Sequence, residues 1–116
     1  MFIENKPDEI ELLSFFESEP VSFNRDNVSF LYASKDEKGI CIDFSFSVAE
    51  GWIQYLIKLD GNECVRNAID GVSSFSIKSD NSGEYLFAEV MTNGLITKVI
   101  IRIKPYISVS SVSLVR

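Results

Sequence analysis

From about residue 20 onward, apolar and polar residues alternate with a period of two, and this alternation constrains the fold more than any other feature of the chain. The clearest segment is residues 40–48, where one set of alternate positions holds Ile40, Ile42, Phe44, Phe46 and Val48 and the other holds Cys41, Asp43, Ser45 and Ser47. Successive side chains of a strand point to opposite faces of its sheet. The pattern therefore predicts an antiparallel strand with one buried and one solvated face.

Turn signals divide the same alternation into further predicted strands. These cover residues 28–33, 52–59, 72–79, 84–92, 95–104 and 106–115. The connections are short, which predicts that consecutive strands pair as antiparallel neighbours. The strongest hairpin signal is Asn93-Gly94, between two alternating segments. Pro105 interrupts the alternation, so residues 106–115 are expected to form an edge strand.

A helix is predicted over residues 6–18. Pro7 suits the first helical position, because its missing N–H has no partner there in any case. Ile10, Leu13 and Phe16 follow helical spacing and are expected to form the buried stripe, with Leu12 and Phe15 beside it. The helix should end before Pro20, because the residue before a proline avoids helical angles.

The segment 62–70 fits two structures. As a helix it has Asn62 as N-cap and a buried face that holds Cys64, Val65, Ala68 and Ile69. As a strand, only Val65 and Ile69 keep the alternation. The short helix is favoured on this pattern.

These elements predict a single domain over residues 1–116. Its expected class is mainly β (α+β): a curved antiparallel meander sheet or half-barrel of about six to seven strands, with an N-terminal helix and a short middle helix. The 116 residues suffice for a core without metal or disulfide support.

Nearly all of the net charge lies at the N-terminus. The chain carries −6 overall, and its first 19 residues hold six acids and one base, which accounts for −5 of that total. The acids are Glu4, Asp8, Glu9, Glu11, Glu17 and Glu19. They lie largely off the predicted apolar stripe, so they are expected to face water or a partner.

Several functions are disfavoured by what the chain contains. It has no histidine, which is the usual general acid or base at neutral pH, so no catalysis is expected. Cys41 and Cys64 do not suffice for a zinc site, and no metal or cofactor is expected. Both cysteines are expected to be small buried residues with reduced thiols. The acidic balance argues against direct nucleic-acid binding, and the sequence lacks a membrane-length apolar run and a signal-peptide pattern, so the expected location is cytoplasmic.

The acidic helix allows two interpretations. It could be a solubilising face, or it could be a docking surface whose field accelerates association with a basic partner. On the second interpretation the partner-binding residues are Asp8, Glu9, Glu11, Glu17 and Glu19.

The chain resembles the bacterial immunity proteins of contact-dependent growth inhibition and related polymorphic toxin systems. The resemblance is one of type over the whole chain, and the segment Gly51-Trp52-Ile53-Gln54-Tyr55-Leu56-Ile57-Lys58-Leu59-Asp60-Gly61 is similar to that group. It implies a heterodimer with a cognate toxin, often a nuclease, that is blocked at or near its active site. The expected function is therefore neutralisation of a toxin. Charge reversal on the acidic helix would test whether this helix binds the toxin.

Two other functions remain open at this stage. A small-ligand or lipid carrier would have an apolar cavity lined by Trp52, Phe44 and Phe46. A secretion or assembly chaperone would pair through the edge strand at residues 106–115.

Overall fold

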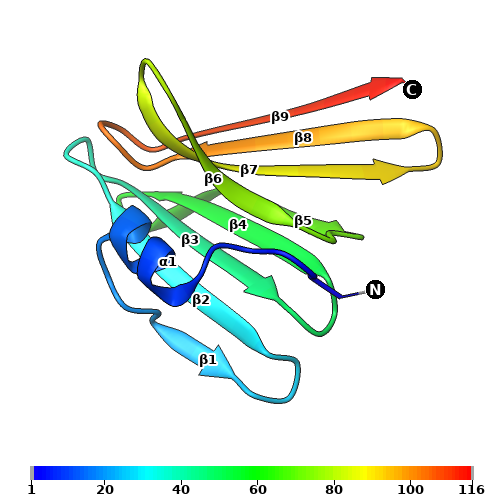
Figure 1. Cartoon of the computed structure of the whole chain (residues 1–116). Coiled ribbons are helices and arrows are strands. Elements are labelled where there is room, and N and C mark those ends of the chain that lie inside the picture. Colours follow the sequence, from blue (N-terminus) through cyan, green and yellow to red (C-terminus); the bar gives the residue numbers. More distant parts are fainter. Residues whose placement is uncertain (1, 116) are drawn as a thin grey trace.

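The computed structural model describes residues 2–115, and they form one helix and nine strands (Figure 1). In chain order the elements are α1 (Glu9–Phe16), β1 (Ser22–Asn24), β2 (Ser29–Lys35), β3 (Ile40–Ser47), β4 (Trp52–Leu59), β5 (Asn62–Asp70), β6 (Phe75–Asp80), β7 (Gly83–Thr92), β8 (Leu95–Arg102) and β9 (Ser108–Val115). The prediction of a mainly β fold with an N-terminal helix is confirmed.

The strands form two antiparallel sheets, each a simple meander. The first has the order β1-β2-β3-β4-β5 and the second the order β6-β7-β8-β9. The sheets are joined by the segment between β5 and β6, and α1 lies against the first sheet, near β2 and β3 (Figure 1). The predicted count of about six to seven strands in one sheet is too low, because β1 and β5 were not recognised and the meander divides into two layers.

The core consists of the inward-facing positions of both sheets. On β3, the alternate residues Ile42, Phe44 and Phe46 are fully buried, while Cys41 and Asp43 on the other face are partly exposed. The period-two pattern thus predicted the buried face of this strand correctly.

Aromatic rings connect the helix to both sheets. The ring of Phe16 in α1 stacks on Tyr32 of β2 at 4.8 Å between centroids and on Phe44 of β3 at 5.7 Å. The ring of Phe46 lies 5.0 Å from that of Phe75, at the start of β6 in the second sheet. Such separations are typical of favourable aromatic pairs, which add about 0.5–1.5 kcal/mol beyond area burial.

The prediction of a short middle helix is wrong, because Asn62–Asp70 is strand β5 and pairs with β4 along its length. The preceding Asp60 and Gly61 both have positive φ, 51° and 80°. Two such residues form the turn that best matches the twist of an antiparallel hairpin. This turn directs the chain back along the free edge of β4. There β5 forms hydrogen bonds with the backbone groups of β4. As an edge strand, β5 leaves Cys64 exposed, and Cys41 is only partly covered, so neither cysteine is the buried residue predicted.

The helix is shorter than predicted. It begins at Glu9, after the N-cap Asp8, and ends at Phe16 because Glu17 adopts a left-handed backbone with φ of 57°. Pro7 therefore precedes the N-cap and does not occupy the first helical position. Within residues 2–115, no helix combines the length and the apolar character that a membrane crossing requires.

Two predictions about the second sheet are confirmed. Asn93 and Gly94, with φ of 47° and 81°, form the hairpin turn between β7 and β8. The last strand, β9, lies at an edge of its sheet.

Phe44 is expected to be central to stability. Replacing it (Phe44→Ala) removes a fully buried ring that contacts Phe16, Phe46 and Phe75, and should lower the free energy of unfolding by about 3–5 kcal/mol. Urea unfolding followed by circular dichroism measures this loss. Phe23→Ala is the control, because that ring is 54% exposed, and it should cost about 1 kcal/mol or less. Equal losses would contradict the central role of the Phe44 ring.

Candidate protein-binding surface

The N-terminus of α1 is stabilised by two of the acids that the sequence singled out. The Asp8 carboxylate accepts a hydrogen bond from the Glu11 N–H at 2.8 Å, and the Glu11 carboxylate accepts one from the Asp8 N–H at 3.0 Å. This reciprocal pair is a capping box, which satisfies two backbone donors at the helix start. Asp8 and Glu11 therefore have a structural role besides any role in binding.

The helix buries a different face from the one predicted. Leu12, Phe15 and Phe16 are buried against the sheet, whereas Ile10 is 77% exposed and Leu13 is 40% exposed. Two overlapping stripes share Phe16, and the stack of Phe16 on Tyr32 orients the helix so that the stripe with Leu12 and Phe15 faces inward. The prediction that Ile10 and Leu13 belong to the buried stripe is therefore wrong.

All five acids predicted to bind a partner are exposed, but they do not form one cluster. Glu9 and Glu11 lie in the first turn and, two residues apart, project to opposite flanks of the helix. Glu17 follows the last turn and forms an ion pair with Lys104, both side chains being more than half exposed. Glu19 lies two residues beyond Glu17, in the segment that leads to β1.

The fold lets Glu9 and Glu19 act on one buried side chain, the phenol of Tyr32. Burial raises the pKa of the Tyr32 phenol, and the negative charges of Glu9 and Glu19 raise this pKa further. Both carboxylates therefore lie close enough to Tyr32 to act on the same group, although they are ten residues apart in the chain.

The solvent side of α1 thus combines apolar and acidic residues, and we call it the α1 surface: Glu9, Ile10, Leu13, Glu17 and Glu19. The exposed position of Ile10 and Leu13 was not predicted from the sequence. The sequence does contain a sign of this exposure. Five of the eight helical residues are apolar, which is more than one buried stripe can hold. Exposed apolar residues surrounded by polar ones are one feature of protein-binding surfaces.

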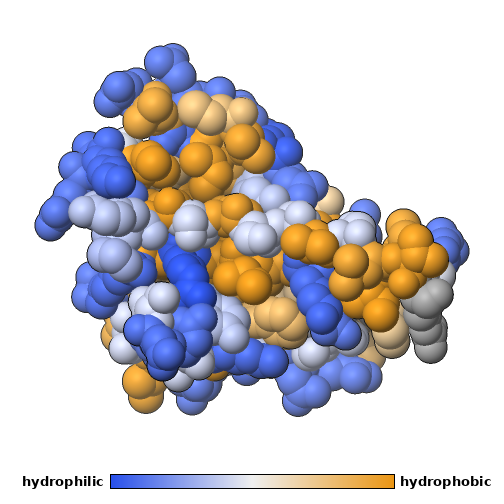
Figure 2. Space-filling view, turned by 90° about the horizontal axis from the view of Figure 1, so that it is seen from above, coloured by the Kyte–Doolittle hydropathy of each residue, from blue (hydrophilic) through white to orange (hydrophobic). Residues whose placement is uncertain are grey.

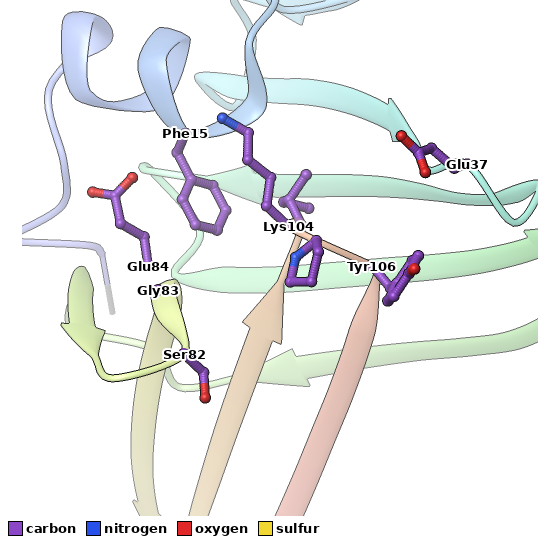
Figure 3. A pocket seen from close by; sticks show the side chains of 9 residues that line it. Phe15, Glu37, Ser82, Gly83, Glu84, Lys104 and Tyr106 are labelled. Atoms are coloured by element: carbon purple, nitrogen blue, oxygen red, sulfur yellow. The ribbon is translucent and has the colours of Figure 1, made fainter.

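A groove adjoins the C-terminal end of α1 (Figure 3). Its volume is about 540 Å³, and it is bounded by the turn between β2 and β3, the turn between β6 and β7, and the connection between β8 and β9. The buried side chains of Phe15 and Ile103 contribute its apolar lining, and the exposed Glu37, Glu84 and Lys104 contribute its charges. This groove could not be predicted from the sequence, because its walls come from four segments that are distant in the chain.

Asp36 ties two walls of the groove together. Its carboxylate accepts hydrogen bonds from the N–H groups of Lys38 and Ile40 in its own turn, at 2.9 and 3.0 Å, and from the Ile107 N–H at 2.9 Å. Ile107 belongs to the connection that leads into β9, so this one side chain links the two sheets. The Ile107 N–H is the main reason why the pKa of Asp36 lies below its usual value.

Trp52, Phe44 and Phe46 do not line a common cavity, as they would in a ligand carrier. Phe44 and Phe46 are fully buried on the inner face of β3, and they face other rings. In the pairing of β3 with β4, the neighbours of Phe44 and Phe46 are Tyr55 and Ile53, so Trp52 lies on the opposite face. Its indole N–H donates to Glu50 at 3.0 Å.

Comparison with known proteins gives one informative likeness. A scan against models of protein families matches none of them, and a search of curated proteins finds no match either. Among solved structures, the chain is similar to one in a contact-dependent growth inhibition toxin–immunity protein complex from Klebsiella pneumoniae 342. The two chains are 64% identical, the match covers 98% of this chain and 100% of that one, and the TM-score is 0.96. An identity this high over nearly the whole chain shows a common family as well as a common fold.

The Asp36 link should make stability depend on pH. Because the folded-state pKa of Asp36 is below its unfolded value, the carboxylate stabilises the fold above the unfolded pKa, and this contribution is lost as the pH falls through the folded pKa. Asp36→Asn should lower the free energy of unfolding at pH 7 and flatten its decline between about pH 5 and pH 2. Urea unfolding across this range measures both effects, with Asp26→Asn at an exposed position as the control. Parallel pH profiles for wild type and Asp36→Asn would contradict the link.

Proposed function

The chain belongs to the immunity proteins of contact-dependent growth inhibition systems, and on that basis we propose that it binds and neutralises a cognate toxin protein through the α1 surface. The observation that carries this proposal is the 64% identity, over nearly the full chain, to a chain of a toxin–immunity complex. In this function the chain acts as an inhibitor that covers its partner, and its own side chains perform no reaction.

We further propose that the toxin is a basic nuclease. A nuclease needs clustered Lys and Arg residues to hold phosphates. Glu9, Glu17 and Glu19 are all exposed near α1, within the stretch that carries nearly all of the net charge. Such a field would attract a basic cleft and repel nucleic acid, so the chain would occupy the cleft in place of the substrate.

The exposed apolar pair supplies what the acids alone do not. Ion pairs between exposed groups contribute little to affinity, with a median of about 0–1 kcal/mol. Burial of Ile10 and Leu13 against the toxin would remove apolar surface from water and exclude water from the surrounding carboxylates. On this proposal, the acids govern the association rate and the apolar pair slows dissociation.

The charge of the α1 surface is tested by triple reversal. Glu9→Lys, Glu17→Lys and Glu19→Lys together should lower the association rate constant with the toxin about tenfold or more at low salt, and less at high salt. Stopped-flow measurement at both salt concentrations gives this constant. Asp8 and Glu11 are left unchanged because they cap the helix.

The matched control has the same change in net charge at distant sites. It combines Asp26→Lys, Asp70→Lys and Glu89→Lys, all at exposed positions outside α1. A small effect of this control, beside a large effect of the first variant, assigns the association to the α1 surface. Equal effects would mean that only the overall charge matters and would contradict the proposed surface.

The apolar pair is tested by a single truncation. Leu13→Ala should weaken the complex about fivefold to thirtyfold, mainly through faster dissociation, as expected for an interface residue worth about 1–2 kcal/mol. Leu95→Ala is the control, because Leu95 is 42% exposed and Leu13 is 40% exposed, but Leu95 lies in the β7–β8 hairpin. Surface plasmon resonance gives both rate constants. A larger loss for Leu95→Ala than for Leu13→Ala would place the toxin elsewhere.

A further inference from the structure

Three of the four sheet edges are protected against pairing with another chain. β1 has only three residues. β5 carries Glu63, Arg66 and Asp70, and its pairing with β4 shifts in register between Ile57 and Lys58. β6 carries charged residues at Lys78 and Asp80. Short length, charges and bulges are the devices by which natural proteins keep sheet edges from pairing.

The fourth edge, β9, has none of these devices. Its sequence, Ser-Val-Ser-Ser-Val-Ser-Leu-Val, contains no charge and no proline over eight residues. It pairs with β8 in one unbroken register from Ser108 to Val115. An edge of this length and regularity presents a row of backbone donors and acceptors that another strand can satisfy.

Apolar side chains lie beside this edge on the outer face of the sheet. The register places Met91, Ile96 and Leu114 in one row across β7, β8 and β9, and Phe87, Ile100 and Ser110 in another. Met91 is 57% exposed, Val112 47% and Leu114 49%. One of the groups of apolar side chains in Figure 2 lies at the right-hand end of the molecule, the end at which β9 and the β7–β8 hairpin finish in Figure 1.

This edge is complementary to itself. An antiparallel pair of β9 strands, related by a two-fold axis perpendicular to the sheet, preserves the outer face in both copies. If Val112 faces its own copy, Leu114 faces Ser110 of the second copy. The row of Met91, Ile96 and Leu114 then continues into the row of Ser110, Ile100 and Phe87 across the boundary, so one apolar strip spans both chains.

We propose that a second copy of this chain pairs with β9, so that the two second sheets join edge to edge with Val112 at the two-fold axis. The charge of this face favours a second copy over a basic toxin. It carries Lys78, while Lys98 lies opposite Glu89 and Arg102 forms an ion pair with Asp80, so this face is nearly balanced in charge and lacks the acidic field of the α1 surface. Two eight-residue strands that pair along one edge form a small interface, so we expect a dissociation constant of roughly micromolar.

The dimer leaves the proposed toxin surface free. α1 lies on the first sheet near β2 and β3, whereas β9 is the far edge of the second sheet (Figure 1). This inference goes beyond the proposed function and is measured without toxin, so either can fail while the other holds.

The experiment is sedimentation equilibrium of the full chain, without toxin, from about 1 µM to 1 mM, a range that brackets a micromolar constant. Wild type should form a dimer that depends on concentration. Val112→Lys should weaken dimerisation about tenfold or more, because it places two like charges directly opposite each other. Phe23→Lys is the matched control, since Phe23 is 54% exposed on the edge strand β1 of the first sheet, and it should leave the dimer unchanged.

A mixture of variants tests the register. Val112→Glu alone should also weaken dimerisation, but an equimolar mixture with Val112→Lys should restore it, because opposite charges then face each other across the axis. Circular dichroism and thermal unfolding establish that each variant is folded.

Three results would overturn the proposal. One is a wild-type monomer at every concentration. Another is a dimer that Val112→Lys leaves intact, which would place the contact elsewhere. The third is a monomeric wild type whose toxin affinity falls on Val112→Lys but not on Phe23→Lys, which would mean that the edge receives a strand of the toxin.

Discussion

The stack of aromatic rings between the helix and the two sheets is the interaction on which the rest of the structure depends. Phe16 from α1 stacks on Tyr32 and Phe44 of the first sheet, and Phe44 and Phe46 contact Phe75 of the second. These rings come from four elements, which are α1, β2, β3 and β6. Because interiors are close-packed, moving one ring would displace its neighbours, so the stack determines how the helix and the sheets are placed relative to one another.

The position of the helix in turn determines which surface a partner can meet. With Leu12, Phe15 and Phe16 buried, Ile10 and Leu13 must face solvent. They do so on a helix that is capped at its start and anchored through its last turn. A surface held in this way loses little conformational freedom on binding, which favours tight association with a toxin.

The chain has two surfaces of contrasting chemistry on different sheets. The α1 surface is acidic with an apolar centre, and it suits a basic partner. The β9 edge is uncharged and bordered by apolar rows, and it suits a strand of its own kind. Because one surface relies on charge and the other on backbone pairing, salt should weaken the first contact much more than the second.

The local features of this protein were determined by its sequence. Alternation along residues 40–48 predicted the buried face of β3, Asn93-Gly94 predicted the β7–β8 hairpin, and the acids of the first 19 residues were expected to face water or a partner. These features depend on side-chain direction and turn geometry within a few residues, which is the range that a sequence pattern reports.

Three features were decided by the tertiary structure. Asn62–Asp70 became a strand because the turn at Asp60-Gly61 carries it along the free edge of β4. The helix buried Leu12 and exposed Ile10 because Phe16 meets the ring of Tyr32. The groove formed where Asp36 accepts a hydrogen bond from Ile107, 71 residues away. A periodic pattern shows which residues of a segment share an apolar face. The segments that pack against this face are distant in the chain. Only the packing of these segments decides which of several possible faces is buried.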